Sequence, residues 1–542
     1  MTDLAPARRW PADASAFAAR LFDEVAAMSP DKRGVSRPAY SAVESAVLDH
    51  LDAAARAEGL ETWRDAGGNL YAARAGTREA PRVMLIGSHV DSVPQGGNFD
   101  GLAGVVAGLA GLVRAEREGA EPPVPVHLVA LRGEESAWFG PCYLGSRIAT
   151  GQLTATELGA THRADKRPLS QHLADLSFDP AAFEAGRPTL DLDRVAGWLE
   201  LHIEQGPVLI ERNLPVAAVS GIRGNIRHRE IRCEGTAGHS GAVPQEMRHD
   251  AVLAVADLLR EMEAWVAQAI EDGDDLVFTC GMIGTDPARH ALTRIPDEVR
   301  FSIDLRSLEQ PAIDRAHAAL MDLMASVAAR RGVRFHADPA QPAAPARCDA
   351  GIVSSLVAAM MGHGLPPTVM ASGAGHDAAI FAAAGVPSGM LFVRNRNGSH
   401  NPDEAMDLGD FDLACAILYD VLWRGMEDQM TSDAPPAFGS LAEIVRERGG
   451  GTYAFEAARQ EALRLAREHP GHAMALHLAA TAAGQVAQRF GREAVGARTA
   501  QDAAQRFEHQ LSVLDTAAAA SDPGRRLQLL NQLAAELLHG EV

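Results

Sequence analysis

Several features are missing from this 542-residue chain, and each absence excludes a class of protein. The five cysteines are scattered without a Cys-x-x-Cys pair, which argues against a disulfide framework or a cysteine-rich zinc site and favours a reducing compartment. No run reaches roughly 18 uninterrupted apolar residues, so we expect no membrane span. The N-terminus lacks the apolar core of a signal peptide, so the cytoplasm is the expected location.

Positive charge is also scarce relative to negative charge. The chain has 50 basic and 71 acidic residues, which gives a formal net charge of −21. This surplus argues against nucleic acid and anionic membranes as main partners, and it suits a soluble enzyme without naming a substrate. The hydrophobic content of 47% is ordinary for a globular protein, and the length predicts two or three domains.

The order of apolar runs predicts an α/β protein. Residues 82–90 and 125–135 have the character of buried strands, and residues 101–118 between them have that of a helix. A strand, a helix and a second strand in this order predict a mostly parallel sheet with helices on both faces. Helical spacing of apolar residues over 14–28 and 39–59 adds two helices before the sheet.

Two changes of composition predict the domain organisation. From about residue 216, strand-like alternation surrounds a long apolar helix, which indicates a small inserted α+β domain for a lid or for dimerisation. After the proline-rich stretch 431–440, Ala, Gln and Leu recur at helical spacing, which indicates a helical appendage. We therefore expect a catalytic α/β domain in two parts, residues 1–215 and 331–430. The insert between them would comprise residues 216–330, and the C-terminal helical appendage would comprise residues 440–542.

Polar side chains follow several of the predicted strands, where ligands bind in open parallel sheets. They are His89, Asp91, Asp100, Glu134, Glu135, His202 and His400. Taken singly, each is more often part of a turn, a helix cap or a solvated surface. Together, imidazole and carboxylate groups suit Zn²⁺, Mn²⁺, Co²⁺ or Ni²⁺ better than Ca²⁺. Five of them could be ligands: His89, Asp100, Glu135, His202 and His400. Five protein ligands are too many for one open catalytic zinc and fit two ions that share a bridging carboxylate.

Seven segments carry a resemblance to a known family. They are GSHVDSVPQGGNFDG, GEES, LHIEQGP, GTAGHSGAVPQEMRHDA, IPDEVRFSIDLR, GAGHDA and GSHNPDE. With these segments the chain resembles the M20-type metallohydrolases over about residues 30–430, and within them the hydantoinase/carbamoylase branch of ureido amidases. That branch includes N-carbamoyl-L-amino acid hydrolases, allantoate amidohydrolases and β-ureidopropionases. The resemblance implies two divalent ions per subunit, Zn²⁺ or else Mn²⁺, Co²⁺ or Ni²⁺, and hydrolysis of a linear amide or ureido C–N bond.

The resemblance also implies which residues bind the ions. His89 and His202 would hold one ion, Glu135 and His400 would hold the other, and Asp100 would bridge the two. The position of His202 separates branches of the superfamily. Peptidases and aminoacylases usually have an acid there, whereas ureido amidases have His followed by Ile-Glu-Gln, as in this chain.

Further residues resemble the family's catalytic and substrate-binding groups. Glu134 would be the general base, Asp91 would orient His89, and His239 in the insert would stabilise the developing oxyanion. Glu134 would pass the proton of the attacking water to the leaving nitrogen. The residues that would surround the substrate are Gln205, Thr293, Arg306, Gly373, Gly375 and His376.

Arg306 resembles the family's clamp on the substrate carboxylate, a bidentate task that suits a guanidinium group. The chain departs from the family at two other positions. Thr293 stands where Asn is usual, and Trp138 stands where Arg is common. These departures put the identity of the substrate in doubt and leave the metal ligands intact.

Two alternatives stay open. The chain could be an M20 aminoacylase, a peptidase or another amidase that acts on a non-ureido amide, because the altered elements lie on the substrate side. It could also be a metal-free binding protein on the same scaffold. The expected partners are a small ureido or amide substrate with a carboxylate and a second copy of the chain. In the resembling family the insert pairs two subunits, and its His, here His239, reaches over the partner's metals.

Overall fold

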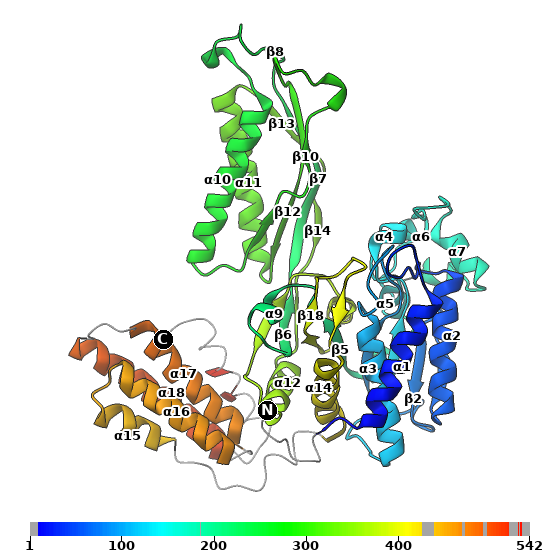
Figure 1. Cartoon of the computed structure of the whole chain (residues 1–542), viewed down its shortest axis with the longest axis vertical. Helices are drawn as coiled ribbons and strands as arrows, with labels where there is room; N and C mark the ends of the chain where they lie inside the picture. Colours follow the sequence, from blue (N-terminus) through cyan, green and yellow to red (C-terminus); the bar gives the residue numbers. More distant parts are fainter. Residues whose placement is uncertain are drawn as a thin grey trace. The chain divides into compact units, whose positions relative to one another are not determined.

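The computed structural model describes residues 9–184, 186–424, 438–468, 472–490, 496–519, 529–530 and 532–533. Its chain divides into two compact units (Figure 1). The first comprises Met1–Val219, Cys348–Met370 and Ala384–Val542, and the second comprises Ser220–Arg347 and Ala371–Ala383. Each unit is therefore built from segments that are far apart in the sequence.

The first unit contains a sheet whose central strands are parallel. Its strands follow the order β1-β2-β4-β3-β5-β17-β6. Strand β3 pairs in parallel with β4 and β5, and β17 pairs in parallel with β5. The outer pairs β1–β2, β2–β4 and β17–β6 are antiparallel. The strand bounds are Glu61–Arg64 (β1), Leu70–Ala73 (β2), Val83–His89 (β3), Val126–Leu131 (β4), Val195–Ile203 (β5), Val216–Ile222 (β6) and Ser388–Val393 (β17).

This arrangement confirms the predicted fold class. The parallel centre is rich in Val, Ile and Leu because both of its faces are covered, and β4 is buried at every position. The antiparallel hairpin of β1 and β2 was not predicted, since its two four-residue strands show no clear alternation.

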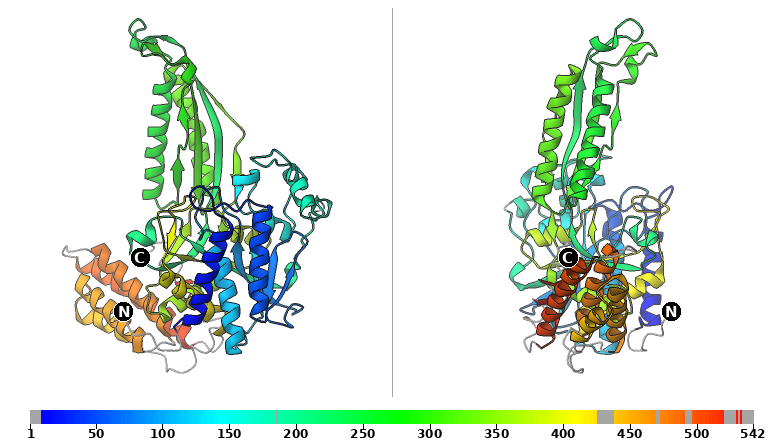
Figure 2. Two further views of the ribbon diagram at one scale, coloured as in Figure 1. Left: turned by 45° about the vertical axis from the view of Figure 1, so that its right-hand side comes forward. Right: turned by 90° about the vertical axis from the view of Figure 1, so that its left-hand side faces the viewer.

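Helices α1 (Ala12–Met28), α2 (Ala42–Ala57), α3 (Leu102–Glu118), α12 (Ala350–Gly362) and α14 (Leu408–Tyr419) pack in the first unit. Figure 2 shows α1 beside α3. Helix α3 is buried from Leu102 to Ala115, which explains why its sequence is apolar all round. It approaches β5 closely at Gly104, where a Cβ would lie 2.3 Å from the carbonyl oxygen of Leu201. Glycine is therefore required at that helix–strand contact.

A run of short helices follows β4. They are α4 (Ser136–Phe139), α5 (Leu144–Ala149), α6 (Ala155–Leu158), α7 (Leu169–Asp175) and α8 (Ala181–Glu184). A small core of their own, which includes Trp138, Phe139, Leu169 and Leu173, holds them together. Their shortness leaves little periodicity to recognise in the sequence.

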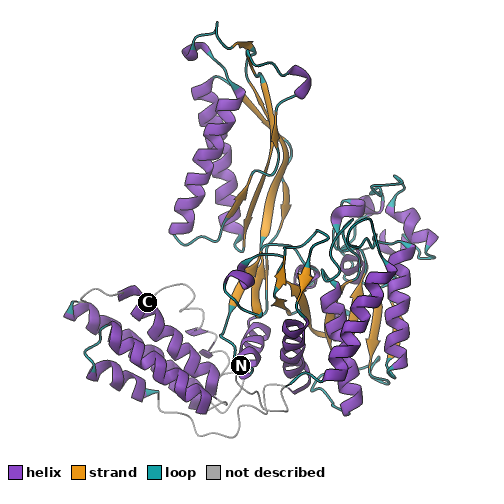
Figure 3. Ribbon diagram, viewed as in Figure 1, coloured by secondary structure: helices purple, strands orange, loops and turns teal. Residues whose placement is uncertain are grey.

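The second unit is an antiparallel sheet covered by two long helices (Figure 3). Its sheet follows the order β10-β12-β7-β13, with bounds Ile283–Gly284, Glu298–Ser307, Gly224–Glu234 and Arg334–Ala337. Burial alternates along β12, so Val299, Phe301, Ile303 and Leu305 face α10 (Ala251–Glu271) and α11 (Gln310–Arg331). The predicted α+β insert is confirmed.

The C-terminal helices are α15 (Gly439–Glu447), α16 (Thr452–Glu468), α17 (Ala473–Phe490) and α18 (Ala497–Ala519). They share a separate core of Phe, Leu, Val and Ala, in which Phe455 packs edge-on against Phe490 and Phe507. The predicted helical appendage is confirmed. Most of the predicted proline-rich linker, residues 431–437, lies outside the described residues. Within the described part of the chain, no helix has both the length and the apolar character needed to cross a membrane.

Candidate metal centre

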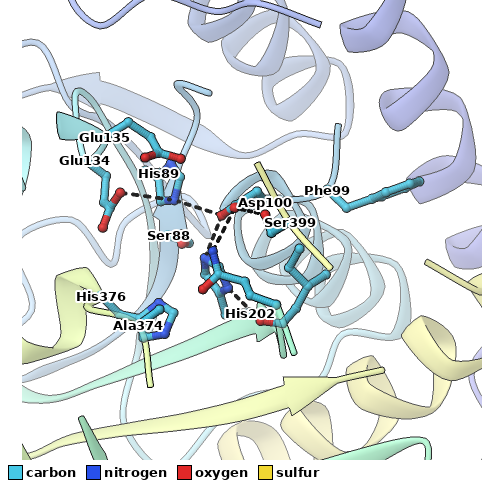
Figure 4. A network of polar contacts seen from close by, with 12 residues as sticks. Ser88, His89, Phe99, Asp100, Glu134, Glu135, His202, Ala374, His376 and Ser399 are labelled. Carbon is cyan, nitrogen blue, oxygen red and sulfur yellow. Dashed lines mark hydrogen bonds and ion pairs between the residues drawn. The ribbon is translucent and has the colours of Figure 1, made fainter. Parts of the chain in front are cut away.

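Four of the five predicted ligands, His89, Asp100, Glu135 and His202, gather where the strands of the first unit end (Figure 4). His89 is the last residue of β3, His202 lies near the end of β5, and Glu135 follows β4. Because these neighbouring strands are parallel, their carboxyl ends share one edge of the sheet. Asp100 precedes α3, and His400 comes from the loop after β17. We call these five residues the strand-end cluster.

One half of the strand-end cluster consists of two imidazoles and a carboxylate. Asp100 Oδ1 lies 3.1 Å from His202 Nε2 and 3.6 Å from His89 Nε2. The Nδ1 atoms of both histidines face carbonyl oxygens, those of Asp91 at 3.1 Å and Ile203 at 2.9 Å, so each Nδ1 must donate. In a neutral imidazole, Nε2 then presents a lone pair to a carboxylate. Such a set of acceptors fits a shared cation.

The other half of the strand-end cluster consists of His400 and Glu135 together with the second carboxylate oxygen of Asp100. Asp100 Oδ2 lies 3.5 Å from His400 Nε2, which is itself 3.2 Å from Glu135 Oε1. In each half, the potential ligand atoms all lie within 4.8 Å of one another. Asp100 thus belongs to both groups through different oxygens, as a bridging ligand does. The first half offers two imidazoles and a carboxylate, and the second half offers two carboxylates and an imidazole. Both donor sets suit Zn²⁺ and similar ions.

The electrostatics of the cluster favour positive charge. Burial opposes charge on His89, but Glu134, Asp100 and Asp91 outweigh that penalty and raise the pKa of His89 well above its ordinary value. Burial raises the pKa of Glu135, and its hydrogen bond from His400 only partly offsets this. Several buried carboxylates in one place thus attract a cation, which can be a proton or a metal ion.

Asp91 connects the ligands to the loop after β4. It is fully buried, and its carboxylate accepts from the backbone N–H groups of Glu134 at 2.9 Å and Glu135 at 3.1 Å. Asp91 Oδ1 also lies 3.3 Å from His89 Nδ1. Glu134 Oε2 is 3.9 Å from His89 Nε2, at the margin of the cluster. Asp91 therefore contacts two predicted ligands, His89 and Glu135, together with the predicted base Glu134.

Sequence reasoning gave no role to two residues that position Asp100. Glu404 is buried and accepts from the backbone N–H groups of Phe99 at 2.9 Å and Asp100 at 3.2 Å, and from Ser399 Oγ at 2.8 Å. Burial raises the pKa of Glu404 to about 7. Ser399 Oγ also lies within hydrogen-bond distance of Asp100, so its single O–H is shared between the two carboxyl groups. Both residues lie in the GSHNPDE segment, so an acid four residues after His400 was the available signal.

Gln205 contacts the same carboxylate. Its Nε2 donates to Asp100 Oδ2 at 2.9 Å, and its backbone N–H donates to Asn395 Oδ1 at 3.0 Å. Its Oε1 is buried and has no hydrogen-bond partner in the described structure. A buried acceptor beside the cluster is compatible with the predicted place of Gln205 around the substrate.

The remaining predicted residues lie in the second unit, in separate places. His239 and Thr293 are exposed neighbours, since Ser240 N donates to Thr293 O at 2.8 Å and β8 (Gly238–His239) pairs with β11 (Arg294–Ile295). Arg306 donates to Asp304 Oδ2 at 2.7 Å and to the carbonyl oxygen of Gly373.

The rest of the predicted pocket wall lies beside Gly373. His376 is buried and pairs with Ser372 Oγ at 2.8 Å, and Gly375 precedes it just before α13 (Asp377–Ala383). Arg306, Gly373, Gly375 and His376 thus belong to one locality, whereas His239 and Thr293 form another.

Comparison with known proteins decides the family. Residues 85–424 match the Peptidase family M20/M25/M40. The chain belongs to the M20 family. This confirms the resemblance that the motifs indicated.

Individual relatives and solved structures indicate which branch of the M20 family this chain is similar to. An N-carbamoyl-L-amino acid amidohydrolase of Geobacillus stearothermophilus is 34% identical over 393 residues, which are 72% of this chain and 93% of that protein. An allantoate amidohydrolase of Bacillus subtilis (strain 168) is 29% identical over 367 residues, 68% of this chain and 86% of its own. An amidase of the hydantoinase/carbamoylase family from Burkholderia multivorans has a TM-score of 0.70 at 26% identity and covers 78% of this chain and 99% of its own.

The M20 match does not include the C-terminal helices. It stops at residue 424, and α15 begins at Gly439. All five residues of the strand-end cluster lie within the match. The family relationship therefore accounts for the part of the chain that carries the candidate metal ligands.

Proposed function

We propose that this M20 chain is a metal-dependent amidohydrolase that cleaves a linear C–N bond of a ureido acid, such as an N-carbamoyl-L-amino acid or allantoate. The observation that carries the proposal is the pair of ligand groups that share Asp100. The names of the relatives support the ureido substrate, since they include N-carbamoyl-L-amino acid amidohydrolases and allantoate amidohydrolases.

The proposed cofactor is a pair of divalent ions per subunit, Zn²⁺ or else Mn²⁺, Co²⁺ or Ni²⁺. His89, His202 and Asp100 would hold one, and Glu135, His400 and Asp100 the other. When bound, such ions would supply Lewis acidity, which acidifies water and polarises a carbonyl group. Glu134 would accept a proton from the attacking water and deliver it to the leaving nitrogen. With an N-carbamoyl amino acid the final products are the amino acid, ammonia and CO₂.

Residues of the second unit are proposed to handle the substrate. The guanidinium of Arg306 has the fork geometry that binds a carboxylate, and it would exchange part of its pairing with Asp304 for the substrate. His239 would donate to the developing oxyanion. Thr293 beside His239, together with Gly373, Gly375 and His376 beside Arg306, would set the selectivity of the pocket.

The second unit is also the proposed dimer interface. Its edge strand β10 exposes Ile283, and the preceding Met282 is exposed to 62%. Exposed apolar side chains on an unpaired strand edge favour association with another surface. Pairing of identical inserts about a two-fold axis is the commonest solution for such a surface. The cytoplasm stays our expected location.

The reaction is tested by assaying purified protein, loaded with each of the four metals, for ammonia release from N-carbamoyl-L-amino acids, allantoate and ureidoglycolate. N-acyl amino acids and dipeptides are run in parallel. The proposal expects the highest kcat/KM on a ureido acid. A higher kcat/KM on an N-acyl amino acid or a dipeptide would instead establish the aminoacylase or peptidase alternative.

A further inference from the structure

We propose a further divalent-cation site of the zinc type, formed by His162, Asp165 and His172 in the first unit. These residues are distinct from the strand-end cluster and from every residue given a catalytic role above. One potential ligand atom of each lies within 4.8 Å of the others. Two imidazoles and a carboxylate suit Zn²⁺ or Co²⁺ better than Ca²⁺ or Mg²⁺, which prefer oxygen ligands.

The backbone holds two of the three residues in a tight loop. Thr161 and Pro168 close this loop by an antiparallel bridge, and His162 N donates to Arg167 O at 2.8 Å. Asp165 Oδ1 accepts from Arg167 N at 3.0 Å, which fixes the carboxylate inside the loop. Helix α7 starts directly after the bridge and supplies His172. The three side chains are therefore placed by local structure.

The spacing of the ligand atoms matches tetrahedral zinc. His162 Nδ1 lies 3.3 Å from Asp165 Oδ1, and His172 Nε2 lies 3.2 Å from Asp165 Oδ2. Two atoms bound to one tetrahedral zinc at about 2.0–2.1 Å lie about 3.3–3.4 Å apart. His172 Nε2 is also within hydrogen-bond distance of Asp165 Oδ1, at 3.3 Å, so one carboxylate oxygen faces both rings. The carboxylate thus sits at a ligand-to-ligand distance from both rings.

A buried polar atom points to the same conclusion. His162 is 9% exposed, and its Nδ1 has no hydrogen-bond partner among the described residues. Leaving a buried polar atom unsatisfied costs free energy, and a bound ion would remove that cost. Trp138 stacks on His162 at 5.8 Å between ring centroids, and Phe139 packs against both His162 and His172 at 5.1 Å. These aromatic rings hold the imidazoles in place without competing for their nitrogens.

The site is open on one side. The Asp165 side chain is 40% exposed, so an ion can enter from solvent and keep a position for water. Of the neighbouring cations, Arg167 pairs with Asp175, and Lys166 donates to the carbonyl oxygen of Arg163. The charge of Arg167 is thus paired with a carboxylate, and the Lys166 ammonium is held at a backbone carbonyl oxygen.

The test counts zinc. Wild type, His162→Gln/His172→Gln, Asp165→Asn and a control variant are dialysed against the same micromolar free Zn²⁺, and bound zinc is measured by mass spectrometry. The control is His50→Gln, whose ring nitrogen pairs with Glu24 on the surface of the first unit. We expect the double variant and Asp165→Asn to bind one zinc ion fewer per chain than wild type, and His50→Gln to bind as many.

Because Asp165 is substantially exposed, Asp165→Asn retains the fold even where the double variant does not, and circular dichroism verifies this. Equal zinc content in wild type and folded Asp165→Asn overturns the proposal. The readout is independent of turnover, so it is unaffected by whether the proposed ureido activity holds.

Discussion

The M20 part of the first unit and the C-terminal helices use buried positions for different purposes. In the M20 part, the ends of β3, β4 and β5 bury His89, Asp91, Glu135 and His202, whose charges cost free energy unless they are paired or bind a cation. The core of the C-terminal helices consists of Phe, Leu, Val and Ala. The M20 part thus buries a cluster of polar groups at these strand ends beside its own apolar core, whereas the buried residues of the C-terminal helices are mainly apolar. The predictions below test that separation.

The largest effect is expected at Glu134. Glu134→Gln should lower kcat by about 10²–10⁴-fold with metal content unchanged, because only the group that moves the proton is lost. Ammonia release and metal analysis measure the two quantities. Glu456→Gln in α16 is the matched control, since Glu456 pairs with Arg459 on the C-terminal helices, and it should keep full activity. Near wild-type turnover by Glu134→Gln would remove it from the role of base.

The second prediction concerns the core of the C-terminal helices, where a substitution should affect stability and not turnover. Phe455 is fully buried, so Phe455→Ala should destabilise the C-terminal helices by about 3–5 kcal/mol and leave turnover by the M20 part unchanged. Calorimetry should show a lower-temperature transition for the helices alone. If turnover were lost at temperatures where only the C-terminal helices have unfolded, the M20 part would depend on these helices and the prediction would be wrong.

The acid dependence of stability in the M20 part should depend on a buried histidine of its sheet. Burial lowers the pKa of His127 in β4 from 6.5 to about 4, so the folded M20 part keeps this ring neutral while the unfolded chain binds a proton. The contribution of His127 to the free energy of unfolding is complete above pH 6.5. It falls by about 2–3 kcal/mol as the pH drops to about 4. His127→Gln should flatten the acid side of the M20 unfolding transition, as followed by calorimetry. An unchanged acid dependence would contradict this assignment.

A smaller effect is expected at Asp91, which supports a ligand without being one. Asp91→Asn should lower metal affinity or activity by about 10–100-fold, because it weakens the orientation of His89 and of the loop that carries Glu134 and Glu135. Competition with a chelator measures the affinity. Wild-type affinity together with wild-type activity in Asp91→Asn would mean that the backbone alone holds the loop.

The sequence was informative where a residue's type and its place after a strand coincided. Short apolar runs predicted β3 and β4, and the shared edge of parallel strands then brought His89 and Glu135 together. The same logic could not find His162 and His172, because their approach depends on a turn with Lys166 at φ 61° and on a seven-residue helix. The role of Glu404 could not be predicted either, because an acidic residue in a polar loop is usually a solvated surface residue.

The central claim is that one carboxylate joins two metal sites at the strand ends. Anomalous diffraction from crystals of the Zn²⁺-loaded protein tests it most directly. We predict two peaks at the strand-end cluster that share Asp100, one bound by His89 and His202 and the other by Glu135 and His400. A single peak there, or two peaks that Asp100 does not join, would contradict the account.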